Sequence, residues 1–263
     1  MSIFKIVFLC LGLLFLCVFA WLYYKQEALL LFPRKLSQDH RFSFPFPFEE
    51  YYLQVKGSRL HAIHATLENP KGMVVYFHGN AGDLSSWGGI AEDFLPLGYE
   101  LLIVDYRGYG KSTAAIHAQE EFFADAEVVY QKASELFPTD KLVLYGRSLG
   151  TGIASYIAAK YPAKALVLET PYYSMQSLAE LYYAWVPSFL LRYKLKTYTW
   201  INQVSCPIYM IHGDTDEIIP WENAKRLSQV IQKKHEFVTV EGGFHNNLNQ
   251  FPEYKEFLNR VLQ

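Results

Sequence analysis

Short apolar runs alternate with segments of helical periodicity through most of the chain. Continuous apolar runs of this length are typical of strands buried on both faces. They predict six parallel strands, at Met73–Phe77, Glu100–Val104, Leu142–Tyr145, Ala165–Leu168, Ile208–Ile211 and Phe237–Val240. Apolar positions at helical spacing predict helices near residues 84–95, 119–137, 149–160, 222–233 and 253–262. The alternation predicts an α/β fold with a mostly parallel, doubly wound sheet.

A hairpin and a linker precede this alternation. Glu49–Val55 and Arg59–Thr66 flank the turn Lys56-Gly57-Ser58, which predicts an antiparallel hairpin. Residues 25–48 are predicted as a linker that ends in the alternating Phe and Pro residues of Phe42–Phe48. Because proline interrupts a helix, we expect this segment to pack in an extended form on the domain or on lipid. The α/β domain is then predicted at residues 49–263.

The N-terminal segment has the length and composition of a membrane span. The chain carries no charge from Ile6 to Tyr24, and as a helix this run would be about 28 Å long at about 1.5 Å per residue. Aromatic residues follow at the end of this apolar run, whereas small residues follow the apolar region of a cleavable signal peptide. We therefore predict residues 1–24 as an uncleaved transmembrane anchor. Basic residues after the span favour a cytoplasmic domain, but a long domain can translocate regardless, so the side of the membrane stays open.

Composition and charge exclude several other classes. Hydrophobic residues make up 51% of the chain and charged residues 19%, which allows a sizeable core and excludes disorder. Lys and Arg number 24 against 26 Asp and Glu, and no basic block occurs, so nucleic acid is not a predicted partner. Of the three cysteines, Cys10 and Cys17 lie in the apolar span and Cys206 in the domain, which makes no disulfide framework.

One serine lies at a strand-to-helix turn. The motif Gly146-Arg147-Ser148-Leu149-Gly150 directly follows a predicted strand and opens a predicted helix. This is the context of a nucleophile elbow, in which flanking glycines let the backbone turn sharply and expose the hydroxyl. A serine hydroxyl is a weak nucleophile, so a histidine must take its proton and a carboxylate must orient that histidine.

Both partners follow in loops at the carboxyl ends of later strands. His212-Gly213-Asp214-Thr215-Asp216 ends one strand, and Gly242-Gly243-Phe244-His245 ends the next. Since the carboxyl ends of parallel strands meet at one sheet edge, these loops lie near Ser148. We predict Ser148, Asp216 and His245 as the catalytic residues. Asp214 remains an alternative to Asp216, and Glu169 is a further one.

Two backbone amides are the predicted oxyanion donors. His78-Gly79-Asn80-Ala81-Gly82 leaves the first parallel strand, and we assign the donors to the backbone of Asn80 and of Leu149. His78 and His212 are interpreted as strand-end residues that shape the turns. Asp105 and Arg107 are interpreted as residues that brace the loop after their strand.

Taken in order, these motifs and Asp105–Ser112 resemble the α/β-hydrolase superfamily, and within it the membrane-anchored Bem46-like and ABHD13-like serine hydrolases. The resemblance spans roughly residues 50 to 263 and includes the N-terminal anchor. In such enzymes the acid lies three residues after the glycine of the penultimate strand's turn, which selects Asp216. The resemblance implies the α/β-hydrolase fold and a Ser-His-Asp triad, and implies little about the substrate.

Residues 171–204 form an aromatic insertion that is too apolar for a solvated loop. The resemblance implies a short helical lid over the active site, with Tyr172, Trp185 and Phe189 as predicted substrate contacts. A serine nucleophile under an apolar lid predicts hydrolysis of esters or thioesters of acyl or lipid-like substrates. The partners expected are that substrate and the lipid bilayer, with no cofactor and no metal. A peptidase or amidase, and a non-catalytic tethered binding module, remain alternatives.

Overall fold

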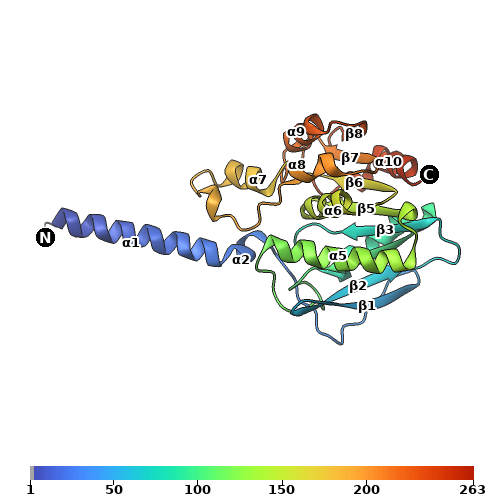
Figure 1. Ribbon diagram of the computed structural model, residues 1–263, viewed down its shortest axis with the longest axis horizontal. Helices are drawn as coiled ribbons and strands as arrows, with labels where there is room; N and C mark the ends of the chain where they lie inside the picture. Colours follow the sequence, from blue (N-terminus) through green and yellow to red (C-terminus); the bar gives the residue numbers. More distant parts are fainter. Residues whose placement is uncertain (1–2) are drawn as a thin grey trace.

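A sheet of eight strands forms the centre of the computed structural model, which describes residues 3–263 (Figure 1). The strand order across the sheet is β1-β2-β4-β3-β5-β6-β7-β8. β1 and β2 form an antiparallel hairpin, β2 pairs antiparallel with β4, and all later pairs are parallel. The strands are β1 Phe48–Val55, β2 Ser58–Ala65, β3 Gly72–Phe77, β4 Tyr99–Asp105, β5 Leu142–Arg147, β6 Ala165–Glu169, β7 Ile208–Gly213 and β8 His235–Val240. The predicted hairpin and mostly parallel sheet are confirmed.

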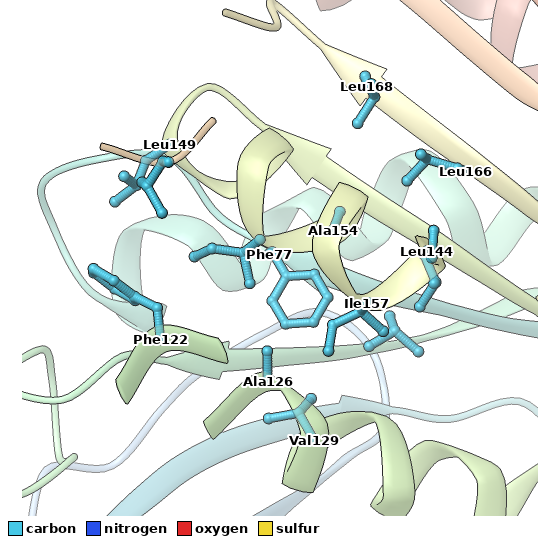
Figure 2. Packing of buried hydrophobic residues seen from close by; sticks show 14 of the residues in the cluster. Phe77, Phe122, Ala126, Val129, Leu144, Leu149, Ala154, Ile157, Leu166 and Leu168 are labelled. Carbon is cyan, nitrogen blue, oxygen red and sulfur yellow. The ribbon is translucent and has the colours of Figure 1, made fainter. Parts of the chain in front are cut away.

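Helices cover both faces of this sheet. The apolar sides of α5 (Gln119–Leu136), α6 (Leu149–Lys160) and α9 (Trp221–Val230) belong to one buried cluster. Those of α3 (Leu84–Trp87), α4 (Ala91–Phe94) and α10 (Pro252–Leu262) belong to the cluster on the opposite face. In the first cluster, the Phe77 ring at the end of β3 lies among Ala126 and Val129 of α5 and Ile157 of α6 (Figure 2). Both faces of the central strands are thereby buried, as their apolar runs predict.

Two predicted helices differ from those observed. The helix expected near residues 84–95 is divided into α3 and α4 by a 3₁₀ turn at Gly88–Ile90, and a second 3₁₀ turn at Leu95–Leu97 follows α4. Glycine and proline weaken a continuous helix, and Gly88 also packs so closely on Phe44 that a Cβ there would lie 2.4 Å from its ring. The helix expected near residues 222–233 ends at Val230.

The N-terminal helix projects away from the domain. Among residues 3–263, one helix, α1 (Ile3–Tyr24), is long and apolar enough to cross a membrane, judged by length and composition. It contains no buried residue and extends outward from one end of the molecule (Figure 1). The short helix α2 (Gln26–Leu30) follows it directly and lies against the domain.

The predicted linker packs on the domain. Short bridges join Pro33 to Gly82 and Lys35 to Gly110, and Arg34 pairs with the buried carboxylate of Asp83. Farther along, the rings of Phe42, Phe44 and Phe46 stack on one another and pack against the second core cluster. The segment after α2 is therefore fixed to the α/β domain along most of its length.

The insertion at residues 171–204 lies at the same end of the molecule as α2 (Figure 1). It holds α7 (Met175–Tyr182), a 3₁₀ turn at Ser188–Leu190 and α8 (Thr197–Trp200). Ser174 caps α7, because its hydroxyl accepts the Ser177 amide.

Candidate active site

Ser148 occupies a strained turn between β5 and α6. Its backbone has φ 50° and ψ −116°, a region that residues with a side chain rarely adopt. The two glycines of the motif make this turn possible. A Cβ at Gly146 would lie 2.4 Å from the Gly150 carbonyl oxygen, and one at Gly150 would lie 1.9 Å from the Phe77 carbonyl oxygen. The local sequence thus holds the serine at the carboxyl end of the sheet.

His245 connects this serine to a carboxylate. Its Nε2 lies 3.0 Å from Ser148 Oγ, and its Nδ1 lies 2.7 Å from Asp216 Oδ2. All three residues are buried. An ionised Asp216 accepts the hydrogen of Nδ1, which leaves Nε2 free to accept the serine proton. The structure therefore brings together the three residues predicted from the sequence.

Asp216 is held in its charged form. Burial disfavours its ionisation, but hydrogen bonds from His212, His245 and the Ile219 amide outweigh that cost and hold the pKa of Asp216 well below its usual range. Its Oδ1 accepts the amides of Ile218 and Ile219, each at 2.8 Å. The carboxylate is thereby positioned from several sides.

The two alternative acids lie elsewhere. Asp214 is exposed, and its Oδ1 accepts the Gly242 amide at 2.7 Å, which ties together the loops after β7 and β8. Glu169 is buried, accepts the Tyr145 hydroxyl at 2.7 Å, and lies 3.2 Å from Arg147 Nε in an ion pair. The structure does not bring either carboxylate to His245.

The residues of the predicted oxyanion donors flank the serine. Leu149 is the first residue of α6, where a backbone N–H has no acceptor within the helix. Asn80 follows Gly79, and a Cβ at Gly79 would lie 3.4 Å from the Cβ of Ser148. The loop after β3 therefore lies directly beside Ser148. The role of the two amides as oxyanion donors stays a prediction.

Three other polar residues, at or just after the ends of β3 and β4, are buried. His78 Nδ1 contacts the Gly79 carbonyl oxygen at 2.7 Å, and burial lowers the pKa of His78 to about 4, so it is neutral near pH 7. Asp105 is fully buried, and burial raises its pKa to about 6. Arg107 binds Asp125 of α5 with two hydrogen bonds of 2.7 Å, which holds the loop after β4 in place.

The three predicted substrate contacts have different environments. Tyr172 is fully buried, and its hydroxyl donates to the Leu149 carbonyl oxygen at 3.0 Å, so it supports the first turn of α6. Trp185 is 62% exposed and lines a cavity between the insertion and the N-terminal helices. Phe189 is 75% exposed and lies outside the residues that line this cavity.

Two positioning residues were not singled out as such from the sequence. His212 Nε2 lies 3.1 Å from Asp216 Oδ2 and 2.8 Å from the Ile219 carbonyl oxygen, so it orients the acid. Arg147 Nη2 lies 3.2 Å from the His245 carbonyl oxygen and 3.0 Å from Asn246 Oδ1, so it holds the histidine loop. Both residues belong to the quoted motifs, but spacing alone does not tell where their side chains point.

A polar groove adjoins the site on one side. It has a volume of about 580 Å³ and is lined by residues of the loop after β3, of α3, of the end of β5 and of the histidine loop, among them Asn80, Trp87, Arg147 and Asn246. Among residues 3–263, His, Cys, Asp and Glu side chains form no group of three or more that could hold a metal ion. The chemistry that this arrangement can perform is nucleophilic attack by a serine with histidine as the base.

Comparison with known sequences gives a family model and a curated relative. Residues 68–201, just over half of the chain, match the family model Hydrolase_4, described as serine aminopeptidase S33. An uncharacterised protein of Mycobacterium tuberculosis, Rv2307c, is 31% identical over 179 residues, which cover 66% of this chain and 63% of that protein. The chain thus spans less than two thirds of the length of this relative.

Solved structures of several esterases are similar. The esterase Pf2001 of Pyrococcus furiosus aligns with a TM-score of 0.71 and 16% identity, over 88% of this chain and 97% of that one. Est1E from Butyrivibrio proteoclasticus aligns with a TM-score of 0.65 and 20% identity, over 81% of this chain and 98% of that one. At such identities the likeness concerns the fold.

Proposed function

Because the chain belongs to the Hydrolase_4 family, described as serine aminopeptidase S33, and has the α/β-hydrolase fold, we propose that it is a serine hydrolase of acyl esters or thioesters. The observation that carries the proposal is the continuous contact from Ser148 Oγ through His245 to Asp216, at 3.0 and 2.7 Å. Two structural neighbours are named as esterases, Pf2001 and an acetyl xylan esterase, which is consistent with this proposal.

The proposed reaction follows from the positions of these residues. Ser148 Oγ attacks the acyl carbonyl while His245 Nε2 takes its proton, and Asp216 stabilises the resulting imidazolium. The amides of Asn80 and Leu149 donate to the oxyanion of the tetrahedral intermediate. The bond to the leaving alcohol or thiol then breaks, and His245 gives it the proton. A water molecule, activated by the same histidine, hydrolyses the acyl-enzyme.

The N-terminal helix is proposed to anchor the enzyme in a membrane. α1 carries no charge from Ile6 to Tyr24 and has no buried residue, so insertion in a bilayer would remove a large apolar surface from water. The insertion is proposed to act as a lid. Together these features support the finer assignment to the membrane-anchored, Bem46-like hydrolases. They also favour lipid-like substrates, since such substrates concentrate at the membrane surface.

Aminopeptidase activity is the second candidate, because the matching family model is described as serine aminopeptidase. Binding the amino terminus of a peptide requires a carboxylate near the reactive serine. The one acid of the insertion, Glu180, lines the cavity beside it, but its Oε1 accepts the Gln176 side-chain amide at 2.9 Å. An aminoacyl anilide therefore belongs in the substrate panel. Its hydrolysis at a rate above that of every ester would favour this candidate.

The deciding experiment treats the wild type and Ser148→Ala with a fluorophosphonate probe and then tests esters of varied chain length. The wild type should be labelled once, and Ser148→Ala should not be labelled although it folds, as circular dichroism would check. Equal labelling of the two proteins would refute the hydrolase proposal. Labelling without turnover of any ester, thioester or anilide would favour a binding module.

A further inference from the structure

A cavity of about 210 Å³ lies between the N-terminal helices and the insertion. One wall comes from Trp21 and Leu22 of α1 and Leu30 of α2, and the facing wall includes Ala179 of α7 and Leu191. Most of the surface that lines the cavity is hydrocarbon. The helix α1, which was predicted as a membrane anchor, therefore also lines a cavity large enough to hold a ligand.

Both walls of this cavity rest on the loops that carry the candidate site. The Leu30 carbonyl oxygen accepts the side-chain amide of Asn80, and Asn80 Oδ1 in turn accepts the Phe32 amide at 3.2 Å. On the other side, the Tyr182 hydroxyl of α7 donates to the Ile218 carbonyl oxygen at 3.1 Å, two residues after Asp216. Each wall of the cavity thus contacts a loop that carries a residue of the candidate site.

The N-terminal wall is fastened to the insertion by buried polar contacts. Gln26 is buried, its Nε2 donates to the Leu190 carbonyl oxygen at 2.6 Å, and its Oε1 accepts the Arg192 amide at 2.9 Å. Glu27 forms an ion pair with Arg192 at 2.8 Å. Satisfied buried polar groups of this kind specify one arrangement of the segments that they join. The cavity is consequently a defined element of the fold.

The insertion that forms one wall of the cavity also carries exposed apolar residues. Leu181, Tyr183, Trp185 and Phe189 are exposed, and the insertion lies at the end of the molecule from which α1 projects (Figure 1). An exposed apolar patch of this kind marks contact with a membrane or a partner. When α1 spans a bilayer, this patch lies at the membrane surface. The hydrocarbon chain of a lipid is therefore the ligand available to the cavity.

We propose that this cavity is the acyl-chain site of the enzyme, and that the chain of an amphipathic ester enters it from the bilayer between α2 and α7. The inference rests on the proposed hydrolase function and adds a specific role for the N-terminal helices, which form one wall of the substrate site. The ester carbonyl then lies at Ser148, and the polar part of the substrate faces the polar groove beside Asn80 and Arg147.

A photocrosslinking experiment maps the chain directly. The full-length protein in phosphatidylcholine vesicles is labelled with a fluorophosphonate whose long alkyl chain ends in a diazirine, then irradiated and digested for mass spectrometry. Crosslinks to residues 21–30 and 179–191 are expected. Crosslinks confined to the polar groove, at Ser86, Trp87 or Asn249, would overturn the assignment. Failure to phosphonylate Ser148 would instead count against the hydrolase function itself.

A pair of matched variants tests the same site by kinetics. Ala179→Trp places an indole in the cavity, whereas Ala184→Trp places one at an exposed position of the same insertion that does not itself line the cavity. Ala179→Trp should lower the octanoate-to-acetate ratio of kcat/KM at least tenfold, and Ala184→Trp should leave this ratio within twofold of the wild type. An unchanged ratio in an Ala179→Trp protein that a short-chain fluorophosphonate still labels would refute the acyl-chain site. If that variant does not fold, the crosslink map decides alone.

Discussion

His212 Nε2 lies 3.1 Å from Asp216 Oδ2, the same carboxylate oxygen that contacts His245 Nδ1 at 2.7 Å. His212 is the penultimate residue of β7 and Asp216 lies in the loop that follows, so a contact between near neighbours in the sequence orients the carboxylate towards the more distant His245. Removing it should disturb catalysis without touching a residue that meets the substrate.

We therefore expect His212→Leu to lower kcat with little change in KM. A hydrogen bond to a charged group contributes roughly 1.5–3 kcal/mol, which corresponds to a loss of about 10- to 150-fold. His212→Gln can still present a donor to Asp216 and should recover part of that loss. Steady-state kinetics at several pH values provide the measurement. Equal defects in the two variants would indicate that His212 only fills space.

The two aspartates of the same loop should differ strongly. Asp216→Asn should lower turnover by roughly 10⁴-fold, because the amide favours the wrong tautomer of the histidine. Asp214→Asn should cost far less, since Asp214 accepts only the Gly242 amide among the contacts of the described residues. Ester turnover of the two purified variants decides between them. A larger loss in Asp214→Asn would reverse the assignment of the acid.

The low pKa of Asp216 predicts a pH-dependent contribution to stability. Its pKa in the folded protein lies below the ordinary carboxyl value of about 3.9, so folding favours the charged form. The contribution is fully present above that ordinary value and is lost as the pH falls towards the folded-state pKa. The Tm difference between the wild type and Asp216→Asn should thus be constant above about pH 5 and shrink below about pH 4. Parallel Tm curves down to the lowest accessible pH would contradict the prediction.

Deletion of residues 1–24 should separate chemistry from access to lipid. The three residues at the site lie wholly in the α/β domain, so turnover of a soluble acetate ester should change little. Activity on substrates embedded in vesicles should fall, because the enzyme no longer stays at the membrane. Trp21 and Leu22 of α1 line the proposed acyl-chain cavity, so the deletion also removes part of one wall. Each buried methylene contributes about 0.8 kcal/mol, so the rise of kcat/KM from acetate to octanoate should be less steep in the truncated enzyme than in the full-length protein. An equally steep chain-length profile in the two proteins would count against a wall formed by α1.

Local sequence determined much of the fold and the position of the nucleophile. The alternating apolar runs predicted the first residue of every parallel strand to within two residues. The predicted helix Leu149–Lys160 has the same first and last residues in the structure. The turn at Ser148 is partly local, because Gly146 is required by its close approach to Gly150 and Thr151, whereas Gly150 is required by the close approach of Phe77 at the end of β3. Periodicity and the steric demand at Gly146 depend on near neighbours and are visible in the chain itself.

Only the tertiary structure decided which groups meet. Asp214 and Asp216 are two residues apart with the same chemistry, yet one carboxylate turns to Gly242 and the other to His245. Tyr172, expected to contact substrate, is buried under α6, whereas α2 joins the insertion through Gln26. Such contacts join segments far apart in the sequence. They depend on how whole helices, strands and loops pack together, and this packing cannot be deduced from periodicity or spacing along the chain.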